Sequence, residues 1–214
     1  MINTIIRGDC IEAMATLPAN SVDLAVTDPP YLVKYRSRDG RRIANDGNDA
    51  WLEPAFARLY RVMKPDSYAV SFYGYDKADL FIAAWKKAGF RIVGHIVFPK
   101  DYASSTGHTQ RRHEQAYLLA KGRPLPPANP APDVIRWTTY TGNRLHPTQK
   151  PIDILTPLIT AFSRPGDLVL DPFAGSGSTL VAARKAGRNF TGIELDRGHF
   201  RTAAGRLFPH TRMG

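Results

Sequence analysis

Residues 167–179 read DLVLDPFAGSGST, a pattern typical of a strand, a loop and a helix in succession. A short apolar run ends in the acid Asp171, a turn with two glycines follows, and Ser178 and Thr179 begin a helical stretch. Glycines in such a turn let the backbone approach a ligand closely, and a helix N-terminus favours negative charge. The next apolar run ends at Glu194, where a carboxylate commonly binds ribose hydroxyls. The stretch therefore predicts a site for a nucleoside cofactor.

The loop sequence also narrows the kind of cofactor. It reads Gly-Ser-Gly-Ser-Thr, which matches neither the G-x-G-x-x-G of dinucleotide sites nor a phosphate-binding loop with Gly-Lys-Ser/Thr. An acid at the strand end would repel a pyrophosphate but suits the ammonium of a methionyl group. A tight turn without a ligand is the alternative, and it leaves the acid unexplained. We therefore predict S-adenosylmethionine, held by Asp171, Pro172, Phe173, Ala174, Gly175, Ser176, Gly177, Ser178 and Thr179.

Short apolar, β-branched runs alternate with helical patterns along the chain, which indicates a largely parallel sheet covered by helices on both faces. The predicted strands are residues 3–6, 22–26, 68–73, 91–98, 115–120, 168–170 and 189–193. The predicted helices are residues 10–16, 51–62, 77–88, 151–162, 178–186 and 197–207. Because no helical pattern separates residues 91–98 from 115–120, these strands are expected to pair as an antiparallel edge. The fold class is α/β, a doubly wound, mostly parallel seven-stranded sheet.

The chain is expected to form one domain with two irregular segments. Its 214 residues suffice for one α/β domain and are too few for two, so residues 1–214 are read as a single unit. Residues 32–48 are polar and basic, which predicts a flexible loop. Residues 121–141 contain several prolines, which forbid a regular element. They lie within residues 100–145, which we expect to be a target-recognition insertion.

The chain is strongly basic, with 29 Lys and Arg against 19 Asp and Glu and a formal net charge of +10. Such an excess suits a polyanionic partner, because basic side chains that neutralise phosphates release condensed counterions. A generic surface with surplus arginine would explain the charge alone equally well. The candidate nucleic-acid-binding residues are those of the irregular segments: Lys34, Arg36, Arg38, Arg41, Arg42, Arg111, Arg112, Arg136 and Arg144.

Other sequence features indicate the reducing interior of a cell. No apolar run approaches the roughly 20 residues of a membrane helix, and the first residues, MINTIIRGDC, lack the apolar stretch of a signal peptide. Cys10 is the single cysteine, so an intramolecular disulfide is excluded, and no cluster of Cys and His suggests a metal site. We expect a cytoplasmic protein with no metal and no membrane association.

A second motif lies in residues 22–31, VDLAVTDPPY, where an apolar strand again runs into a polar turn. The two prolines fix the backbone after Asp28 and remove donors, which leaves carbonyls available as acceptors. An oxygen of Asp28 and the carbonyl of Pro29 form a pair of acceptors suited to an exocyclic amino group. Tyr31 offers a flat face to a base taken out of the helical stack. The predicted catalytic residues are Asp28, Pro29, Pro30 and Tyr31; a rigid turn would explain the prolines but not the whole tetrad.

The tetrad and residues 171–177 together resemble the motifs of the amino-group DNA methyltransferases, which modify N6 of adenine or N4 of cytosine. The order of the motifs, with the target-amine motif first, is similar to the β group of that family. The resemblance spans residues 5–36, 51–120 and 145–203, and it implies a Rossmann-like methyltransferase fold. It also implies cofactor contacts by Asp9, Cys10, Asp28, His146, Thr148, Lys150, Glu194 and Leu195.

The order of the elements independently predicts a circular permutation of the sheet. The cofactor strand and the strand that ends at Glu194 come last in the chain, whereas the strand that would be third comes first. The cofactor loop and Asp28 should then lie at the carboxyl ends of adjacent strands, where α/β sheets bind ligands.

We expect direct methyl transfer to a base flipped out of double-stranded DNA, with Asp28 and the Pro29 carbonyl accepting the N–H groups of adenine N6. Asp at the first position of the tetrad is commoner among adenine-specific members of the family, and cytosine N4 is the alternative. Methylation at cytosine C5 is not expected, because it needs a cysteine nucleophile and Cys10 lacks the family's Pro-Cys setting. An RNA amine methyltransferase and a non-catalytic DNA-binding module are further alternatives. A protein glutamine methyltransferase is disfavoured, because its tetrad typically begins with Asn.

The remaining expectations concern the partners of the protein and the pair His113-Glu114. The recognition segments 32–48 and 100–145 should contact the DNA. The resemblance leaves room for a homodimer and for a companion restriction nuclease. His113-Glu114 is also a family pattern, although a charged start to an edge strand explains it equally well.

Overall fold

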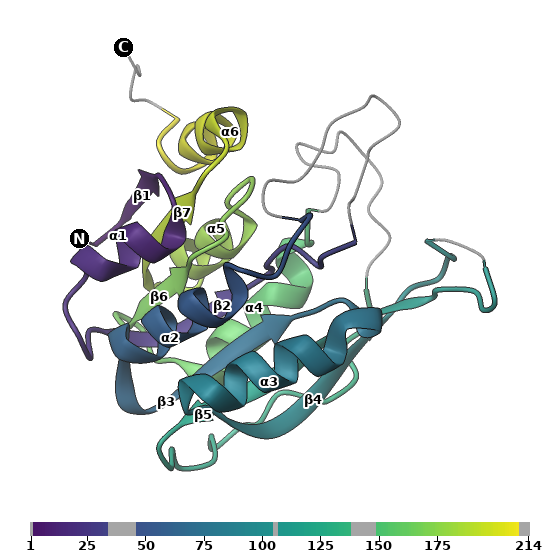
Figure 1. The fold of residues 1–214 in the computed structure, drawn as a ribbon. Helices are drawn as coiled ribbons and strands as arrows, with labels where there is room; N and C mark the ends of the chain where they lie inside the picture. The colour runs from purple at the N-terminus through teal and green to yellow at the C-terminus, as the bar shows by residue number, and fades with distance from the viewer. Residues whose placement is uncertain (1, 34–45, 105–106, 138–148, 210–214) are drawn as a thin grey trace.

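The computed structural model describes residues 2–33, 46–104, 107–137 and 149–209. Its centre is a seven-stranded sheet with the order β1-β7-β6-β2-β3-β5-β4 (Figure 1). The strands are β1 (Thr4–Arg7), β2 (Val22–Thr27), β3 (Met63–Phe72), β4 (Arg91–Pro99), β5 (His113–Lys121), β6 (Leu168–Asp171) and β7 (Asn189–Glu194). Neighbouring strands are parallel except where β5 runs against β3 and β4. The predicted α/β class and mostly parallel sheet are confirmed.

Helices cover both faces of this sheet. They are α1 (Cys10–Thr16), α2 (Leu52–Val62), α3 (Ala78–Ala88), α4 (Ile152–Phe162), α5 (Ser178–Lys185) and α6 (Arg197–Leu207), with a short 3-10 turn, η1 (Tyr75–Lys77). Helices α1, α2 and α3 pack side by side on one face, and α4, α5 and α6 on the other (Figure 1). Met14, Phe56 and Trp85 belong to the core on the first face, and Leu158 and Leu180 to the core on the second. The two cores cover the faces of the sheet, so polar groups can lie together only at the ends of its strands.

Strand β6, which precedes the predicted cofactor loop, and strand β2, which precedes the Asp28 tetrad, are neighbours in the sheet. Strand β6 pairs with β2 in parallel, with Leu24 opposite Val169 and Ala25 opposite Leu170. On its other side β6 pairs with β7, and β7 pairs with β1. The predicted adjacency of the two motif strands is confirmed, and four consecutive strands of the sheet therefore end at one edge.

The expected antiparallel pairing of residues 91–98 with 115–120 is confirmed, but the reversed strand lies inside the sheet. Strand β5 sits between β3 and β4, and β4 occupies the outer position. The burial of the two strands follows from this order. Ala116, Leu119 and Ala120 of β5 are buried, whereas β4 alternates exposed and half-buried residues along its first half. The inner strand is thus the more completely buried of the two.

The proline-rich segment does contribute hydrogen bonds to the sheet, although it forms no regular helix or strand where it is described. The Val97 amide donates to the Asp133 carbonyl (2.7 Å), and the Trp137 amide donates to the Pro99 carbonyl (2.9 Å). Ile135 and Trp137 are buried. Residues 133–137 thus run along the free edge of β4 and satisfy backbone groups that an exposed edge strand would leave open.

Strand β3 begins at Met63, before its predicted start at Tyr68. Its register against β2 moves from Val22 opposite Met63 to Leu24 opposite Tyr68, so the residues between them form an irregularity. Pro65 lies in this irregularity, where its missing amide hydrogen removes no ladder bond. A proline that signals the end of a helix in sequence is tolerated here within a strand.

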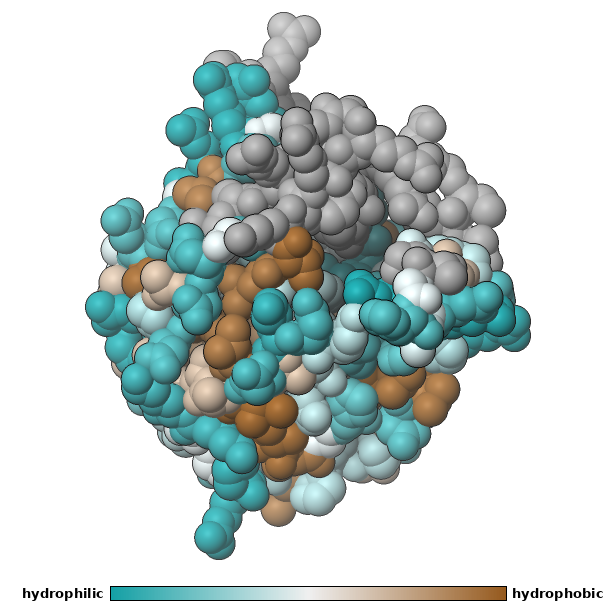
Figure 2. Space-filling model, turned by 45° about the vertical axis from the view of Figure 1, so that its right-hand side comes forward, coloured by the Kyte–Doolittle hydropathy of each residue, from teal (hydrophilic) through white to brown (hydrophobic). Residues whose placement is uncertain are grey.

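Hydrophilic residues cover much of the rim of the face drawn in Figure 2, and hydrophobic ones gather nearer its middle. None of the helices in the described ranges is long and apolar enough to cross a membrane.

Gly177 positions the cofactor loop against α6, and we expect its replacement by alanine to destabilise the fold. Gly177 has φ +79°, and an added Cβ would lie 2.9 Å from the Cβ of Ala203. Gly187 is the matched control, because it has φ +74° but nothing within 4 Å of an added Cβ. Backbone strain alone should cost Gly187→Ala about 1 kcal/mol of unfolding free energy. Gly177→Ala should cost about 2–3 kcal/mol, because overpacking adds to strain. Urea unfolding measures both, and equal losses would contradict the close contact.

Candidate active site

A cavity of about 530 Å³ opens where β1, β7, β6 and β2 end. Each of these strands brings a carboxylate to it: Asp9 follows β1, Glu194 ends β7, Asp171 ends β6 and Asp28 follows β2. The volume is in the range of small-molecule sites in proteins. The position is also the one at which parallel α/β sheets bind ligands, outside the carboxyl ends of their strands.

Asp171 is the most deeply buried of these acids, with 2% of its surface exposed. Its Oδ1 accepts a hydrogen bond from the Phe173 amide (3.0 Å). Burial raises the pKa of Asp171 to about 7, because a charged carboxylate is poorly solvated there, and the nearby carboxylates of Asp28 and Glu194 add to the effect. Among the described residues Asp171 belongs to no ion pair. A ligand with a positive charge would stabilise its ionised form.

Glu194 is held by the backbone of the loops on either side of it. Its Oε2 accepts from the Gly175 amide (2.7 Å), and its Oε1 accepts from the Asp196 amide (2.7 Å). Burial raises the pKa of Glu194, although these two amides favour its charged form. A carboxylate has further lone pairs beyond those two bonds. It can therefore still accept hydroxyl groups from a ligand, as a ribose-binding acid does.

Two polar atoms around the cavity have hydrogen-bonding capacity that a ligand could use. The hydroxyl of Thr27 and the amide oxygen of Gln149 are buried without a hydrogen-bond partner in the described part of the structure, and both residues line the cavity. Gly175 has φ +52°, and an added Cβ there would meet nothing within 4 Å. The loop thus leaves room next to its backbone. Unmatched polar atoms, a buried acid and an open glycine loop fit a polar ligand with a cationic group.

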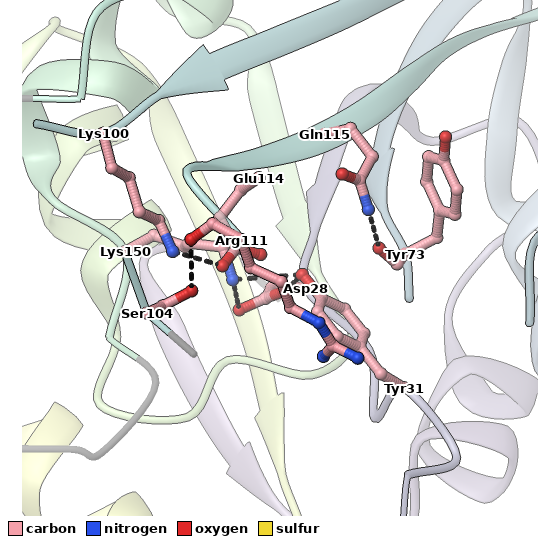
Figure 3. A network of polar contacts seen from close by, with 9 residues as sticks. All are labelled: Asp28, Tyr31, Tyr73, Lys100, Ser104, Arg111, Glu114, Gln115 and Lys150. Carbon is pink, nitrogen blue, oxygen red and sulfur yellow. Dashed lines mark hydrogen bonds and ion pairs between the residues drawn. The ribbon is translucent and has the colours of Figure 1, made fainter. Parts of the chain in front are cut away.

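Asp28 lines the same cavity and makes two strong contacts. Its Oδ1 accepts from the Tyr31 hydroxyl (2.7 Å), and its Oδ2 is paired with the Lys150 ammonium (2.5 Å) (Figure 3). The Lys150 ammonium also lies 3.2 Å from the Tyr31 oxygen and 4.9 Å from the centre of the Phe72 ring. Burial and the charge of Asp28 raise the pKa of Tyr31, so this hydroxyl remains a donor. The tetrad is therefore held in place by Lys150.

The structure gathers most of the predicted site residues around this cavity. Those that line it are Asp9, Cys10, Asp28, Pro29, Pro30, Tyr31, Lys150, Asp171, Pro172, Phe173, Ala174, Gly175, Ser176, Ser178, Thr179, Glu194 and Leu195. Gly177 does not line it, because it faces Ala203 of α6 instead. His146 and Thr148 lie outside the described residues.

Cys10 lines the cavity but is unsuited to act as a nucleophile. It is 7% exposed, and burial, with a further contribution from Asp9, raises the pKa of its thiol to about 12. The reactive form of cysteine is the thiolate, which this environment disfavours. This agrees with the expectation that the chain does not methylate cytosine C5.

The structure describes three of the predicted DNA-binding residues. Arg111 lies over the Tyr75 ring, 4.5 Å from its centre, and donates to the Tyr75 hydroxyl (2.5 Å). Arg112 donates to the Asp101 carbonyl (3.1 Å), and Arg136 is paired with the Asp101 carboxylate (3.2 Å). The remaining candidates lie outside the described residues: Lys34, Arg36, Arg38, Arg41, Arg42 and Arg144.

The two ends of the 32–48 segment are joined beside the cavity. Asp46 is 2% exposed, and its carboxylate accepts from the Val33 amide (3.1 Å). Both residues line the cavity, although residues 34–45 lie outside the described part. The described ends of the segment therefore both lie at the cavity.

Sequence reasoning did not assign a role to one further ion pair near Asp28. The Lys100 ammonium contacts the Glu114 carboxylate (2.5 Å), and 5% of the Lys100 side chain is exposed. The His113-Glu114 pattern at the start of β5 was the only signal for it in the sequence. Nothing in the sequence pointed to Lys100, because the contact depends on how β4 and β5 pair.

Comparison with known proteins identifies the family of this chain. The family model N6_N4_Mtase, described as DNA methylase, matches residues 22–205. The chain belongs to this DNA methylase family. It is 54% identical over 206 residues to "Putative methylase YubD" of Escherichia coli (strain K12), covering 96% of this chain and 90% of that protein. It is 25% identical to the type II methyltransferase M.HinfI of Haemophilus influenzae, covering 96% of this chain and 68% of that protein.

A solved structure agrees with this assignment. The crystal structure of an M1.HpyAVI–S-adenosylmethionine complex superposes with a TM-score of 0.76 at 25% identity, covering 96% of this chain and 98% of that one. Methyltransferases of the N6/N4 family transfer the methyl group of S-adenosylmethionine to an exocyclic amino group. The cationic amino group and ribose of that molecule suit the chemistry of Asp171 and Glu194. The family assignment thus agrees with the cofactor predicted from the loop.

Binding of S-adenosylmethionine should weaken as the pH falls below about 7, because protonation of Asp171 removes the negative charge that would pair with the cofactor ammonium. Calorimetry from about pH 7.5 to about pH 5.5 should show Kd rising by up to about tenfold per pH unit. Asp171→Asn should bind weakly and lose most of this dependence. His199→Gln is the control for the histidine that also lines the cavity, and it should keep the dependence. A wild-type Kd that stays constant over this range would contradict the role of Asp171.

Proposed function

We propose that the protein is a site-specific DNA methyltransferase that transfers the methyl group of S-adenosylmethionine to N6 of adenine. The observation that carries the proposal is that Asp28 and Asp171 open into one cavity. One acid can then hold the cationic cofactor while the other receives the target amine. Holding two reactants in contact in the right geometry can supply a major part of the rate of such a reaction.

Each half of the cavity has a defined task in this proposal. Asp171, Glu194 and the Gly175 loop hold the cofactor, which supplies an electrophilic methyl group on a sulfonium. Asp28 and the carbonyl of Pro29 accept the two N–H groups of the target amine. These bonds pull the nitrogen lone pair out of conjugation with the ring, and the carboxylate stabilises the positive charge that develops on nitrogen. The Tyr31 ring offers the surface on which the flipped base stacks.

Adenine is proposed as the target base because the tetrad begins with Asp28, and amino-group DNA methyltransferases with Asp at this position mostly modify adenine. The acceptor pair itself fits the amino group of either base. Unmethylated genomic DNA incubated with labelled S-adenosylmethionine and then digested to nucleosides identifies the product directly. N6-methyladenine is expected, whereas N4-methylcytosine would replace the adenine proposal while leaving the methyltransferase assignment in place.

Asp28→Ala should lower the rate of methyl transfer by at least about 100-fold, because the developing charge on the amine loses its stabilising partner. Binding of S-adenosylmethionine should stay within about tenfold of the wild type, since Asp171 and Glu194 remain. Single-turnover methylation and calorimetry measure the two quantities. Asp79→Ala is the control, an exposed acid in the first turn of α3. A variant at Asp28 that retains full activity would remove the basis of the mechanism.

Arg111, which lies next to the tetrad, is proposed to contact a DNA phosphate. Gly74 packs against Tyr31, so Tyr75 and the Arg111 stacked on it lie beside the tetrad. Lys87, at the opposite end of α3, is an exposed cation paired with Glu53 and serves as the control. If Arg111 neutralises one phosphate, Arg111→Gln should reduce the slope of log affinity against log salt by about 0.9. Lys87→Gln should leave the slope unchanged, and an equal effect of both variants would contradict a local contact.

A further inference from the structure

Two ion pairs lie side by side next to the target-amine site. Lys150 is paired with Asp28 and Lys100 with Glu114, each at 2.5 Å (Figure 3). The two lysine side chains are 6% and 5% exposed, so their charges are largely removed from water. Buried charges are retained only where partners neutralise them. The four groups therefore form one balanced network of two anions and two cations.

This arrangement leaves Asp28 occupied. Its two oxygens are engaged by the Tyr31 hydroxyl and the Lys150 ammonium. A carboxylate that already neutralises an ammonium is a weaker acceptor for another donor. A positive charge that develops on the target amine would also be repelled by an ammonium at this distance. Although the Asp28 carboxylate keeps further lone pairs, methyl transfer there would be faster if Lys150 moved to another anion.

Glu114 is the anion placed to receive it. Although burial opposes ionisation of Glu114, the ammonium groups of Lys150 and Lys100 hold its pKa below the usual value. The Tyr31 hydroxyl, which lies 3.2 Å from the Lys150 ammonium, also interacts with Glu114, so Glu114 is close to Lys150 while Lys150 contacts Asp28. Because a lysine ammonium is a point charge on a flexible stem, it can move between two nearby carboxylates without a change in the backbone.

Glu114 is itself held in place by the elements around it. Lys100 anchors its Oε1, and the Lys100 ammonium lies 4.8 Å from the centre of the Trp137 ring. Trp137 is buried and is tied to the end of β4 through its amide bond to the Pro99 carbonyl. The segment 133–137 therefore supports the position of Glu114 through Lys100.

We propose that Glu114 is a positioning residue for methyl transfer, which takes over the ammonium of Lys150 when the target amine binds Asp28. The inference rests on the proposed function, in which Asp28 accepts that amine. Lys150 stays next to a carboxylate throughout, so no buried charge is left unpaired. Asp28 gains an open acceptor position at the moment when the amine needs it.

The test compares two variants that differ only at residue 114. Lys100→Met removes the anchor and leaves Glu114 as a partner for Lys150. Lys100→Met combined with Glu114→Gln removes that partner as well, and it leaves no lysine orphaned at position 100. Single-turnover methylation of unmethylated DNA with saturating S-adenosylmethionine should be at least about tenfold slower in the double variant than in Lys100→Met. The Kd for S-adenosylmethionine, from calorimetry, should be the same in both.

A conservative variant and a control distinguish an effect of the Glu114 charge on the rate from an effect on the stability of the fold. Lys100→Met combined with Glu114→Asp keeps the charge and should recover part of the lost rate. Glu53→Gln breaks the exposed pair with Lys87 and should leave the rate unchanged. Urea midpoints within the same range for all variants show that each is folded, so the rates can be compared.

Three results would overturn the inference. Equal rates in Lys100→Met and its Glu114→Gln derivative would show that methyl transfer does not depend on a move of Lys150 to Glu114. A loss of cofactor binding without a loss of saturated rate would place Glu114 with the cofactor. A neutral Gln that works as well as Asp would show that charge at residue 114 is irrelevant. Failure of the proposed function is a separate outcome, because it is recognised by full activity of Asp28→Ala.

Discussion

The parallel pairing of β6 with β2 is the constraint on which the site depends. It brings Asp171 and Asp28, which are far apart in sequence, to the same edge of the sheet and into the same cavity. Strands β7 and β1 continue the row in parallel, so that Glu194 and Asp9 join them. Because the strands run in one direction, their carboxyl ends and the loops that follow are collected on one side. A change of register or order there would separate the two carboxylates.

The two halves of the cavity handle negative charge in opposite ways. Asp171 is buried without an ion pair among the described residues, and its raised pKa reflects that burial. Asp28 is instead neutralised by Lys150. The first arrangement favours a cationic ligand, because such a ligand stabilises the ionised acid. The second orients the Asp28 carboxylate and pairs it with a cation before any ligand is bound.

The local elements followed closely from patterns of residue type. The helices over Cys10–Thr16 and Arg197–Leu207 have the predicted limits, because each begins after a capping acid, Asp9 or Asp196, and carries an apolar stripe. Predictions were less accurate where partners far along the chain decide the conformation. Strand β3 starts before its predicted limit because Met63 pairs with Val22 of β2. The proline-rich segment forms backbone hydrogen bonds because it lies along the outer edge of β4.

The amino-acid sequence by itself determined the chemistry available to this protein: an Asp-Pro-Pro-Tyr tetrad, a glycine loop between an acid and a helix, and a second acid after the next strand. These are short-range patterns, and steric limits and hydrogen bonding within a few residues are enough to specify them. Only the tertiary structure decided that Lys150 neutralises Asp28, that Lys100 anchors Glu114, and that Gly177 serves packing against α6 instead of lining the cavity. Such contacts join residues from different strands and loops, so they depend on strand order and on the burial of charge, which no local pattern records.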